Sequence, residues 1–305
     1  MPKNIPAGTD PTAIGEISAP PFARPPQPSR LFAERASRFM AQASTGGELA
    51  PYLAFLGALC EVQHTIQDSL PELDPPDEAS CTRARNFGMP PIDRNMFAVE
   101  AAFDTLELLI RRASAIEQPL MAAEALDRLA RAGAPERGVM MRNILADAIP
   151  METLAEHVLV AAALQVDFAR LAGHLDGARL VPVGDGACPA CGAPPVSSLI
   201  VGWHGAHGSR FCACSLCGTL WNYVRIKCTL CGSTEGIGYQ EIEGGPGTIK
   251  AETCDKCGCY VKILHQHKDP GLEPVADDVA SLGLDMLMSE GGYRRGSFNP
   301  FLIGY

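Results

Sequence analysis

Eight of the twelve cysteines in this 305-residue chain occur as four Cys-x-x-Cys pairs within a stretch of about seventy residues. The pairs form two copies of the pattern C-x2-C-x22-C-x2-C, offset by 40 positions, so the stretch is an internal repeat. Thiolates in sets of four are typical ligands of a tetrahedral structural metal ion. The candidate metal ligands are Cys188, Cys191, Cys214, Cys217, Cys228, Cys231, Cys254 and Cys257.

A glycine directly follows each of the four pairs. In a metal knuckle the backbone wraps around a thiolate, so that amide N–H groups point at sulfur. The residue after the second cysteine then tends towards positive φ, which only glycine adopts without steric cost. The four glycines are Gly192, Gly218, Gly232 and Gly258. The pattern therefore predicts four metal knuckles, which make up two sites of zinc-ribbon or rubredoxin-like type.

Two questions follow from this pattern: which pairs share an ion, and which metal they bind. We favour Cys188/Cys191 with Cys214/Cys217, and the remaining two pairs together, because a duplication copies whole units. A crossed arrangement, in which pairs one and three share an ion, stays open. Four thiolates suit zinc and iron alike, so the ligands alone do not choose between these metals.

Each copy of about 40 residues is too small to bury a sufficient apolar core unaided. A structural metal contributes roughly 10–16 kcal/mol of apparent free energy per site. This is comparable with the whole stability of a typical domain, about 5–15 kcal/mol. We therefore expect each copy to be unfolded without its metal.

Disulfides and a redox dithiol are the competing interpretations of the cysteines. Disulfides need an oxidising compartment, but the first residues contain no apolar segment of the kind found in a signal peptide. A thioredoxin-like motif would be one pair beside a βαβ pattern. Eight cysteines used as metal ligands fit a reducing compartment, so we expect a cytoplasmic protein.

Charge and hydropathy argue against nucleic-acid and membrane partners. The chain carries a net charge of −10, and residues 184–268 hold seven Lys and Arg against six Asp and Glu. A nucleic-acid-binding ribbon normally presents a basic patch. The longest apolar run, residues 158–164, is far shorter than a membrane span. The oligomeric state cannot be predicted from these features.

Apolar residues at helical spacing predict an all-helical domain over residues 30–183, after a proline-rich extended arm at 1–29. Ser29 is a candidate helix cap, and the run at 158–164 predicts a buried central helix. The expected helices span 30–44, 51–66, 93–113, 119–132, 135–148 and 150–172, with a proline-marked loop between the second and third.

The rest of the chain is expected to form two ribbons, at 184–226 and 227–268, followed by a helix and tail at 269–305. Each ribbon should be a small antiparallel sheet. The predicted strands are 197–201, 211–214, 221–227, 238–242 and 260–266. The C-terminal helix should bury Val275, Val279, Leu282 and Met286, and the apolar end should dock on the body.

Four cysteines and several histidines stand outside the metal pattern. We interpret Cys60, Cys81, Cys212 and Cys259 as packed or free thiols; a reserve ligand or a redox-sensitive role for Cys212 or Cys259 stays open. A closed shell of four thiolates leaves no position for His204, His207, His265 and His267.

Several segments resemble the formate dehydrogenase accessory protein FdhE family. They are CPACGAPPVSS, CSLCGTLWNYVRIKCTLCG, AETCDKCGCYVKILHQHKDP, VADDVASLGLD and GYRRGSFNPF. The bridge formed by Trp221, Arg225 and Lys227 and the Asp277-Asp278 pair are more specific than the knuckles alone. The resemblance implies a cytoplasmic protein that binds the formate dehydrogenase catalytic subunit before its export. It implies the same eight cysteine ligands and favours iron at both sites, with zinc possible.

The function that we expect is therefore a non-enzymatic maturation factor for respiratory formate dehydrogenase. The alternative is a rubredoxin-like iron redox carrier or sensor acting on that enzyme. The chain contains no H-E-x-x-H, P-loop or G-x-S-x-G motif. A catalytic zinc also needs an open coordination position, which four thiolates do not leave.

Overall fold

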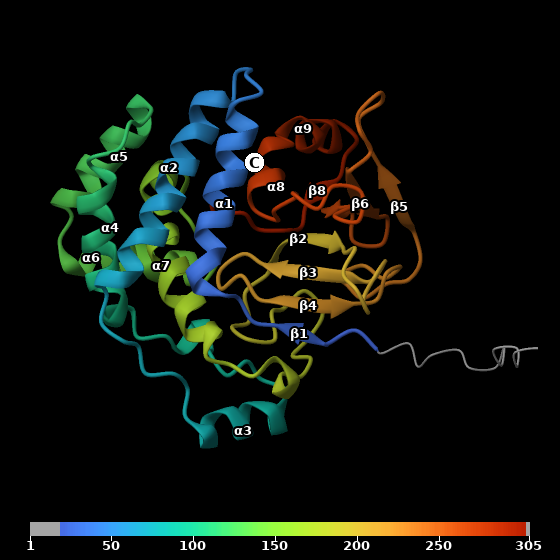
Figure 1. The fold of residues 1–305 in the computed structure, drawn as a ribbon, viewed down its shortest axis with the longest axis horizontal. Helices are drawn as coiled ribbons and strands as arrows, with labels where there is room; N and C mark the ends of the chain where they lie inside the picture. Colours follow the sequence, from blue (N-terminus) through green and yellow to red (C-terminus); the bar gives the residue numbers. More distant parts are fainter. Residues whose placement is uncertain (1–18, 303–305) are drawn as a thin grey trace, which may run out of the picture.

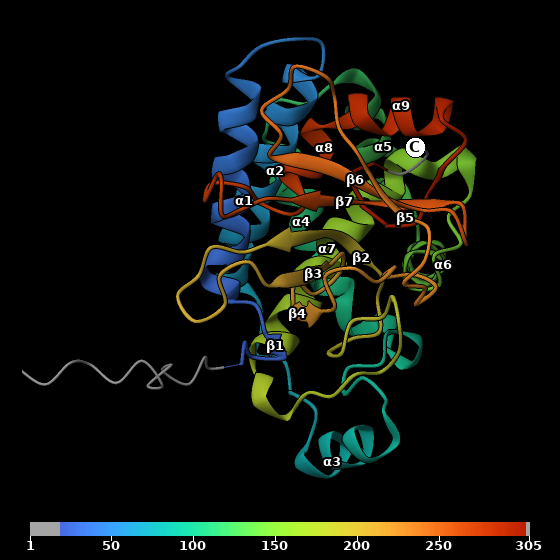
Figure 2. The same cartoon turned by 90° about the vertical axis from the view of Figure 1, so that its right-hand side faces the viewer.

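A computed structural model describes residues 19–302 and consists of a helical layer packed against a twisted β-sheet. Most of the helices between residues 28 and 173 lie together on one side, the helix at 78–87 lies apart at the bottom of the view, and the sheet lies on the other side (Figure 1). Two short C-terminal helices cover one end of the sheet (Figure 2). The predicted order of a helical region, a β region with the cysteines and a C-terminal helix is confirmed. No helix within 19–302 is long and apolar enough to cross a membrane.

The helical layer is arranged around α7, which is buried on nearly every face, as its apolar sequence predicts. Helices α2, α4, α5 and α6 all contact α7. On α2 one face, formed by Phe55, Leu59, Val62 and Ile66, is buried. The helices are α1 (Pro28–Ala43), α2 (Ala50–Ile66), α3 (Glu78–Phe87), α4 (Phe103–Ala113), α5 (Leu120–Arg131), α6 (Ala134–Leu145) and α7 (Leu154–Gly173).

Three helix predictions need correction. The expected 93–113 helix is regular only from Phe103, because short 3-10 turns and extended residues precede it. Helix α3 lies in the segment expected to be a loop: Asp77 caps its start by accepting from the Ser80 N–H, and Gly88 ends it with φ 62°. The prolines of that segment lie outside α3. The central helix starts at Leu154, four residues after Pro150.

All the strands of the described residues join in one sheet, in the order β1-β4-β3-β2-β7-β6-β5, with β8 beside β7. The first cysteine copy supplies β2, β3 and β4, and the second supplies β5, β6 and β7. Parallel pairing of β2 with β7 connects the copies, with Ser198 opposite Ile263. The strands are β1 (Ala23–Arg24), β2 (Pro195–Ile200), β3 (Arg210–Cys214), β4 (Leu220–Tyr223), β5 (Ile237–Gln240), β6 (Ile249–Cys254), β7 (Cys259–Leu264) and β8 (Arg294–Arg295).

This sheet differs from the two separate antiparallel sheets that we expected. All five predicted strands are present within a few residues, but β6 was not predicted. The strand expected at 221–227 ends at Tyr223, because the chain leaves the sheet there to reach the second pair of knuckles. The glycine-containing segments 205–208 and 244–247 connect β2 to β3 and β5 to β6.

The N-terminal arm extends the sheet at its edge. Residues 1–18 of the predicted arm lie outside the described residues, but β1 pairs with β4, and the Phe22 carbonyl accepts from the Asn222 N–H at 2.7 Å. Helix α1 begins at Pro28 and has no side-chain cap, so the expected cap by Ser29 is wrong. Proline suits the first helical position because its φ is already helical.

The C-terminal helix is broken at Ser281 into α8 (Ala276–Ala280) and α9 (Leu282–Glu290). The break changes the helical phase, so Met286 is 58% exposed, and Leu284 and Met288 are buried in its place. The predicted stripe is therefore right at Val275 and Val279, which are buried, and wrong at Met286. The tail docks on the body as predicted as far as residue 302, and residues 303–305 lie outside the described residues: Phe301 contacts Phe39 with ring centroids 6.1 Å apart.

Candidate metal centres

The first centre gathers the four cysteines of the first copy. The Cys188 and Cys217 sulfurs are 3.7 Å apart, and the Cys191 and Cys214 sulfurs are 3.4 Å apart. All four sulfur atoms lie within 4.8 Å of one another. One pair lies on the loop before β2 and the other begins at the last residue of β3, so the antiparallel β2–β3 pairing brings the two knuckles together.

The second centre repeats this arrangement 40 residues later. The Cys228 and Cys257 sulfurs are 3.8 Å apart, and those of Cys231 and Cys254 are 3.7 Å apart. These four sulfurs also lie within 4.8 Å of one another. The favoured grouping of the pairs is thus the one that the structure has, and the crossed arrangement is wrong.

The backbone around the sulfurs has the predicted knuckle geometry. The four glycines after the pairs all have positive φ, between 65° and 76°. Amide N–H groups point at the first sulfur of a pair: Ala190 N lies 3.4 Å from Cys188 Sγ, Leu216 N 3.4 Å from Cys214 Sγ, and Leu230 N 3.4 Å from Cys228 Sγ. These donors offset the negative charge that thiolates acquire on binding a metal.

The sulfur spacing fits a tetrahedral ion. Metal–sulfur bonds of about 2.3 Å place the corners of a tetrahedron roughly 3.8 Å apart, and the four measured sulfur distances are 3.4–3.8 Å. The two clusters could therefore hold two metal ions. Zinc and iron share this geometry, so the donor set suits both metals.

A bound cation would also stabilise the deprotonated sulfurs of the first centre. Burial raises the pKa of Cys188 and Cys191 well above the usual range of a thiol, and the Cys214 and Cys217 sulfurs raise it further. A bound metal ion reverses this preference, because it stabilises the deprotonated sulfur.

The two centres differ in burial. In the first centre Cys188, Cys191 and Cys217 are 0% exposed and Cys214 is 1% exposed. In the second, Cys228 and Cys254 are buried, Cys257 is half-buried and Cys231 is exposed. The repeated sequence does not predict this difference in burial.

Arg94 lies beside the first centre, although no sequence pattern singled it out. Arg94 donates its backbone N–H to the Cys191 carbonyl at 3.3 Å, and its guanidinium forms an ion pair with Asp147 at 2.7 Å. The guanidinium is close enough to the first centre for the Cys191 and Cys214 sulfurs to favour its charged form. Only the tertiary fold brings Arg94 to the knuckles, because nearly a hundred residues separate them.

The residues that carry the resemblance between and after the knuckles contact the sheet, the second centre and the helical layer. Trp221 is buried on β4, and Lys227 pairs with Asp185 at 2.8 Å beside the second centre. Arg225 is exposed, and its carbonyl accepts from Arg210. The Asp277 carboxylate binds Arg38 of α1 at 2.7 Å and so connects the C-terminal segment to the helical layer.

The remaining cysteines lie outside both clusters. Cys60 is buried in the helical core, and burial raises the pKa of Cys212 to about 11. Cys81 donates to the Pro76 carbonyl at 3.6 Å, and Cys259 to the Cys257 carbonyl at 3.4 Å. All four are free thiols, as interpreted from the sequence.

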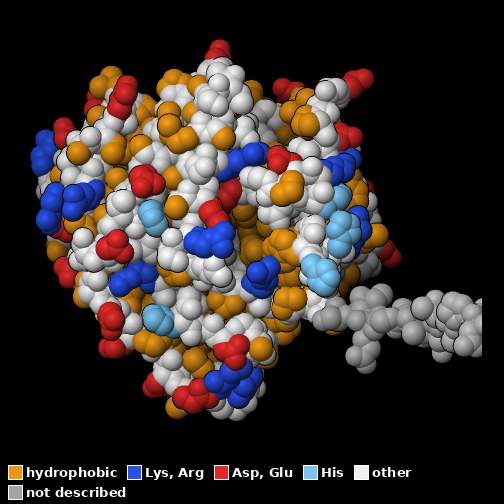
Figure 3. Space-filling view, viewed as in Figure 1, with side chains coloured by type: hydrophobic (Ala, Val, Ile, Leu, Met, Phe, Trp, Pro, Cys, Tyr) orange, Lys and Arg blue, Asp and Glu red, His pale blue; other side chains and the backbone are white. Residues whose placement is uncertain are grey.

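Histidines gather on the sheet side of the surface (Figure 3). The His265 and His267 ring centroids are 5.4 Å apart, and those of His207 and His267 are 6.1 Å apart. Among the described residues, neither potential metal cluster includes a histidine.

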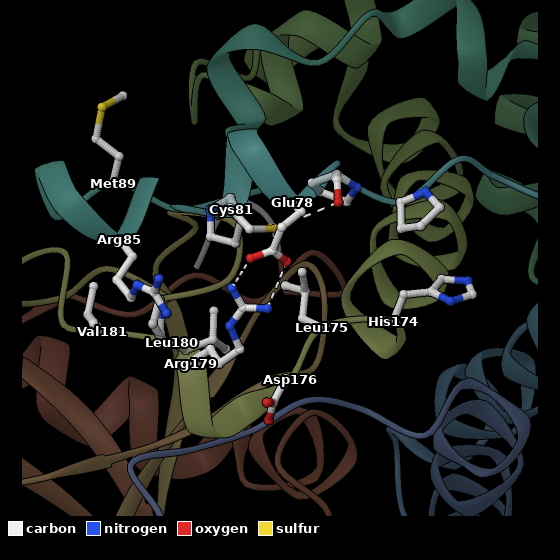
Figure 4. Close-up of a pocket in the computed structure, with 14 residues that line it drawn as sticks. Glu78, Cys81, Arg85, Met89, His174, Leu175, Asp176, Arg179, Leu180 and Val181 are labelled. Carbon is white, nitrogen blue, oxygen red and sulfur yellow. Dashed lines mark hydrogen bonds and ion pairs between the residues drawn. The ribbon is translucent and has the colours of Figure 1, made fainter. Parts of the chain in front are cut away.

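A pocket of about 190 Å³ lies between α3 and the segment after α7. Glu78 and Arg179 form an ion pair across it (Figure 4). The pocket also contains Cys81 and His174, but the His174 ring is directed away from Cys81 (Figure 4). Burial raises the pKa of Cys81, the opposite of what an activated nucleophile needs.

Three family models match the chain in sequence. The FdhE N-terminal model matches residues 20–185, the FdhE central domain 187–225 and the FdhE C-terminal domain 226–302. The chain belongs to the FdhE family. It combines this family membership with two four-cysteine clusters suited to metal ions.

Relatives in the FdhE family are similar over almost their whole length. The "Protein FdhE homolog" of Rhizobium meliloti (strain 1021) is 48% identical over 98% of this chain and 99% of its own. "Protein FdhE" of Escherichia coli O9:H4 (strain HS) is 32% identical over 91% of this chain and 90% of its own. The crystal structure of the FdhE protein from Pseudomonas aeruginosa superposes with a TM-score of 0.81 at 31% identity, covering 93% of this chain and 99% of that one.

Proposed function

We propose that this protein is a cytoplasmic accessory factor for the maturation of respiratory formate dehydrogenase, and that it binds the catalytic subunit of that enzyme. The observation that carries the proposal is the match to FdhE family models over nearly all of residues 20–302, combined with eight cysteines in two four-cysteine clusters. The role is that of a binding protein, not of an enzyme.

In this proposal the eight cysteines bind two metal ions, one per cluster. The resemblance to the family favours iron, and zinc is possible. The ions hold the knuckles at the ends of the sheet and so stabilise a region whose copies are small. The helical layer and the sheet together then present a fixed surface to a large partner.

Affinity purification tests the partner. The full-length chain, tagged and expressed in a formate dehydrogenase-producing bacterium grown anaerobically, should enrich the catalytic subunit over an untagged control. A bait carrying Cys188→Ser should lose metal and recover less of the subunit. If the wild-type bait carries two ions and still does not enrich the subunit, the proposed partner is wrong.

A redox carrier or sensor acting on the same enzyme is the second candidate. The exposure of Cys231 supports it, because a metal near the surface can exchange electrons with a partner. Iron held by four thiolates can change its oxidation state, and zinc cannot. A red protein that bleaches on reduction would support this candidate, and a colourless protein with two zinc ions would exclude it.

The proposal includes no nucleic-acid or membrane partner. Residues 184–268 have only one more Lys or Arg than Asp and Glu, too few for a phosphate-binding patch. A gel-shift experiment at moderate salt should detect no retained nucleic acid. Fractionation of cells should place the protein with the cytoplasmic fraction.

A further inference from the structure

The two centres have the same ligand spacing but different surroundings. In the first, the chain packs over both knuckles. A Cβ built on Gly192 would lie 3.3 Å from Pro90, and one built on Gly218 would lie 2.8 Å from Leu31. Pro90 precedes α4 and Leu31 belongs to α1, so parts of the helical layer cover the first centre from two directions.

One backbone and one side-chain hydrogen bond connect these covering segments to the first centre. Ile92 donates its N–H to the Ala190 carbonyl at 2.9 Å, within the first knuckle. Gln165 of the buried helix α7 donates to the Ser215 carbonyl at 2.8 Å, within the other knuckle. An incoming ligand could reach the first ion only after the helical layer separated from the sheet.

The second centre lacks a comparable cover on one side. A Cβ built on Gly232 would meet the Asp185 carboxylate, but one built on Gly258 would meet no atom within 4 Å, and the Cys231 side chain is exposed. The segment around Arg294 packs beside this knuckle, where the Arg294 N–H donates to the Gly258 carbonyl at 2.9 Å. Cys231 is therefore the ligand of the second centre that faces solvent, beside the half-buried Cys257.

We propose that the second centre is an exchange site, whose ion leaves or is replaced through Cys231 while the first ion is retained. The inference rests on the proposed binding of two ions. In the exchange step an incoming donor bonds to the ion as the metal–Cys231 sulfur bond breaks, and the released thiolate takes a proton from water. No electrons are transferred, so the step needs no oxidant or reductant.

The difference should appear as two rates of metal release. The second ion needs only the loss of one exposed ligand, but the first needs local opening of the helix–sheet interface. Local opening in folded proteins carries a free-energy cost that a surface site does not share. We therefore expect release from the second centre to be faster on the order of tenfold or more.

The test uses the full-length zinc-loaded protein and the chromogenic chelator 4-(2-pyridylazo)resorcinol. The expected result is one zinc per chain in a fast phase and one in a slow phase. Cys231→Ser should abolish the fast phase and keep the slow one. Its matched control is Cys191→Ser, at the equivalent position of the first copy, which should keep the fast phase. Release of both ions at one rate would overturn the inference.

A second measurement does not depend on the variants folding. Brief N-ethylmaleimide treatment of the zinc-loaded wild type, followed by peptide mass spectrometry, should modify Cys231 well before Cys191. Equal labelling of these two cysteines would contradict the exchange site. A protein that purifies with fewer than two ions would contradict the proposed metal binding itself, which distinguishes the two failures.

Discussion

Arg210 and Glu252 form a buried, two-point ion pair that connects the two cysteine copies across the sheet. Arg210 lies on β3 of the first copy and is 1% exposed, and Glu252 lies on β6 of the second and is 4% exposed. Two nitrogens of the guanidinium lie 2.7 and 3.1 Å from the two carboxylate oxygens. Ser198 of β2 and Tyr239 of β5 also bond this pair, so it connects strands on both sides of the β2–β7 junction.

Glu252→Gln should destabilise the protein by about 3–5 kcal/mol, because it leaves the Arg210 charge buried without a counterion. The measurement is the free energy of unfolding in denaturant with both ions bound. The matched control is Glu241→Gln, since Glu241 pairs with Lys250 at 3.0 Å in a more exposed position. That change should cost at most about 1 kcal/mol. Equal effects would contradict the role of the buried pair.

Cys188→Ser should remove the ion of the first centre and unfold the structure around it, because three thiolates no longer close the tetrahedral shell. The measurement is metal content by mass spectrometry together with thermal unfolding. Cys212→Ala is the control, since Cys212 is equally buried but belongs to neither cluster. It should keep two ions and lose about 1 kcal/mol of stability. Full metal content in Cys188→Ser would contradict the assigned ligand.

The buried carboxyl group of Asp167 should make the free energy of unfolding depend on pH. It is fully buried in α7, accepts from Thr105 at 2.7 Å, and burial raises its pKa to about 7. The folded state therefore holds a proton that the unfolded chain releases near pH 4. The stability that this proton contributes is present below about pH 4 and is lost as the pH rises through about 7.

Asp167→Asn should remove this dependence, because asparagine does not titrate. Denaturant unfolding of the wild type and the variant at several pH values between 5 and 8 measures it. We expect the wild type to lose on the order of a few kcal/mol relative to the variant across this range. Parallel curves would show that Asp167 is ionised in the folded protein throughout.

Phe301→Ala should destabilise the protein by about 3–5 kcal/mol, the usual cost of removing a buried aromatic ring. Phe301 is 1% exposed and packs against Phe39 of α1. Met286→Ala is a control on the nearby helix α9, because Met286 is 58% exposed, and it should change stability by at most about 0.5 kcal/mol. Equal melting temperatures for the two variants would contradict the docking of the tail.

Local chemistry explains which features could be predicted from the sequence. A Cys-x-x-Cys-Gly knuckle is formed by neighbouring residues, so the positive φ of Gly192 and its three counterparts follows from the sequence alone. Helix α7 was predictable for the same reason, since its apolar residues are contiguous. The grouping of the cysteine pairs followed from the tandem repeat.

The features that the sequence did not predict depend on contacts between residues far apart in the chain. The parallel contact of Ser198 with Ile263 joins segments from different copies, and no local pattern marks it. Cys191 and Cys231 occupy equivalent positions in the repeat, yet one is buried and the other exposed. Their environments depend on where the helical layer packs, which the sequence around each cysteine does not encode. The burial of Arg210 beside Glu252 is hidden for the same reason.

The central claim is that each set of four cysteines holds one metal ion. Elemental analysis of anaerobically purified protein, with a count of free thiols after unfolding, tests it most directly. The account predicts two equivalents of zinc or iron per chain, with one equivalent lost in Cys188→Ser and one in Cys228→Ser. A chain that folds with no stoichiometric metal, or with disulfides among these eight cysteines, would contradict it.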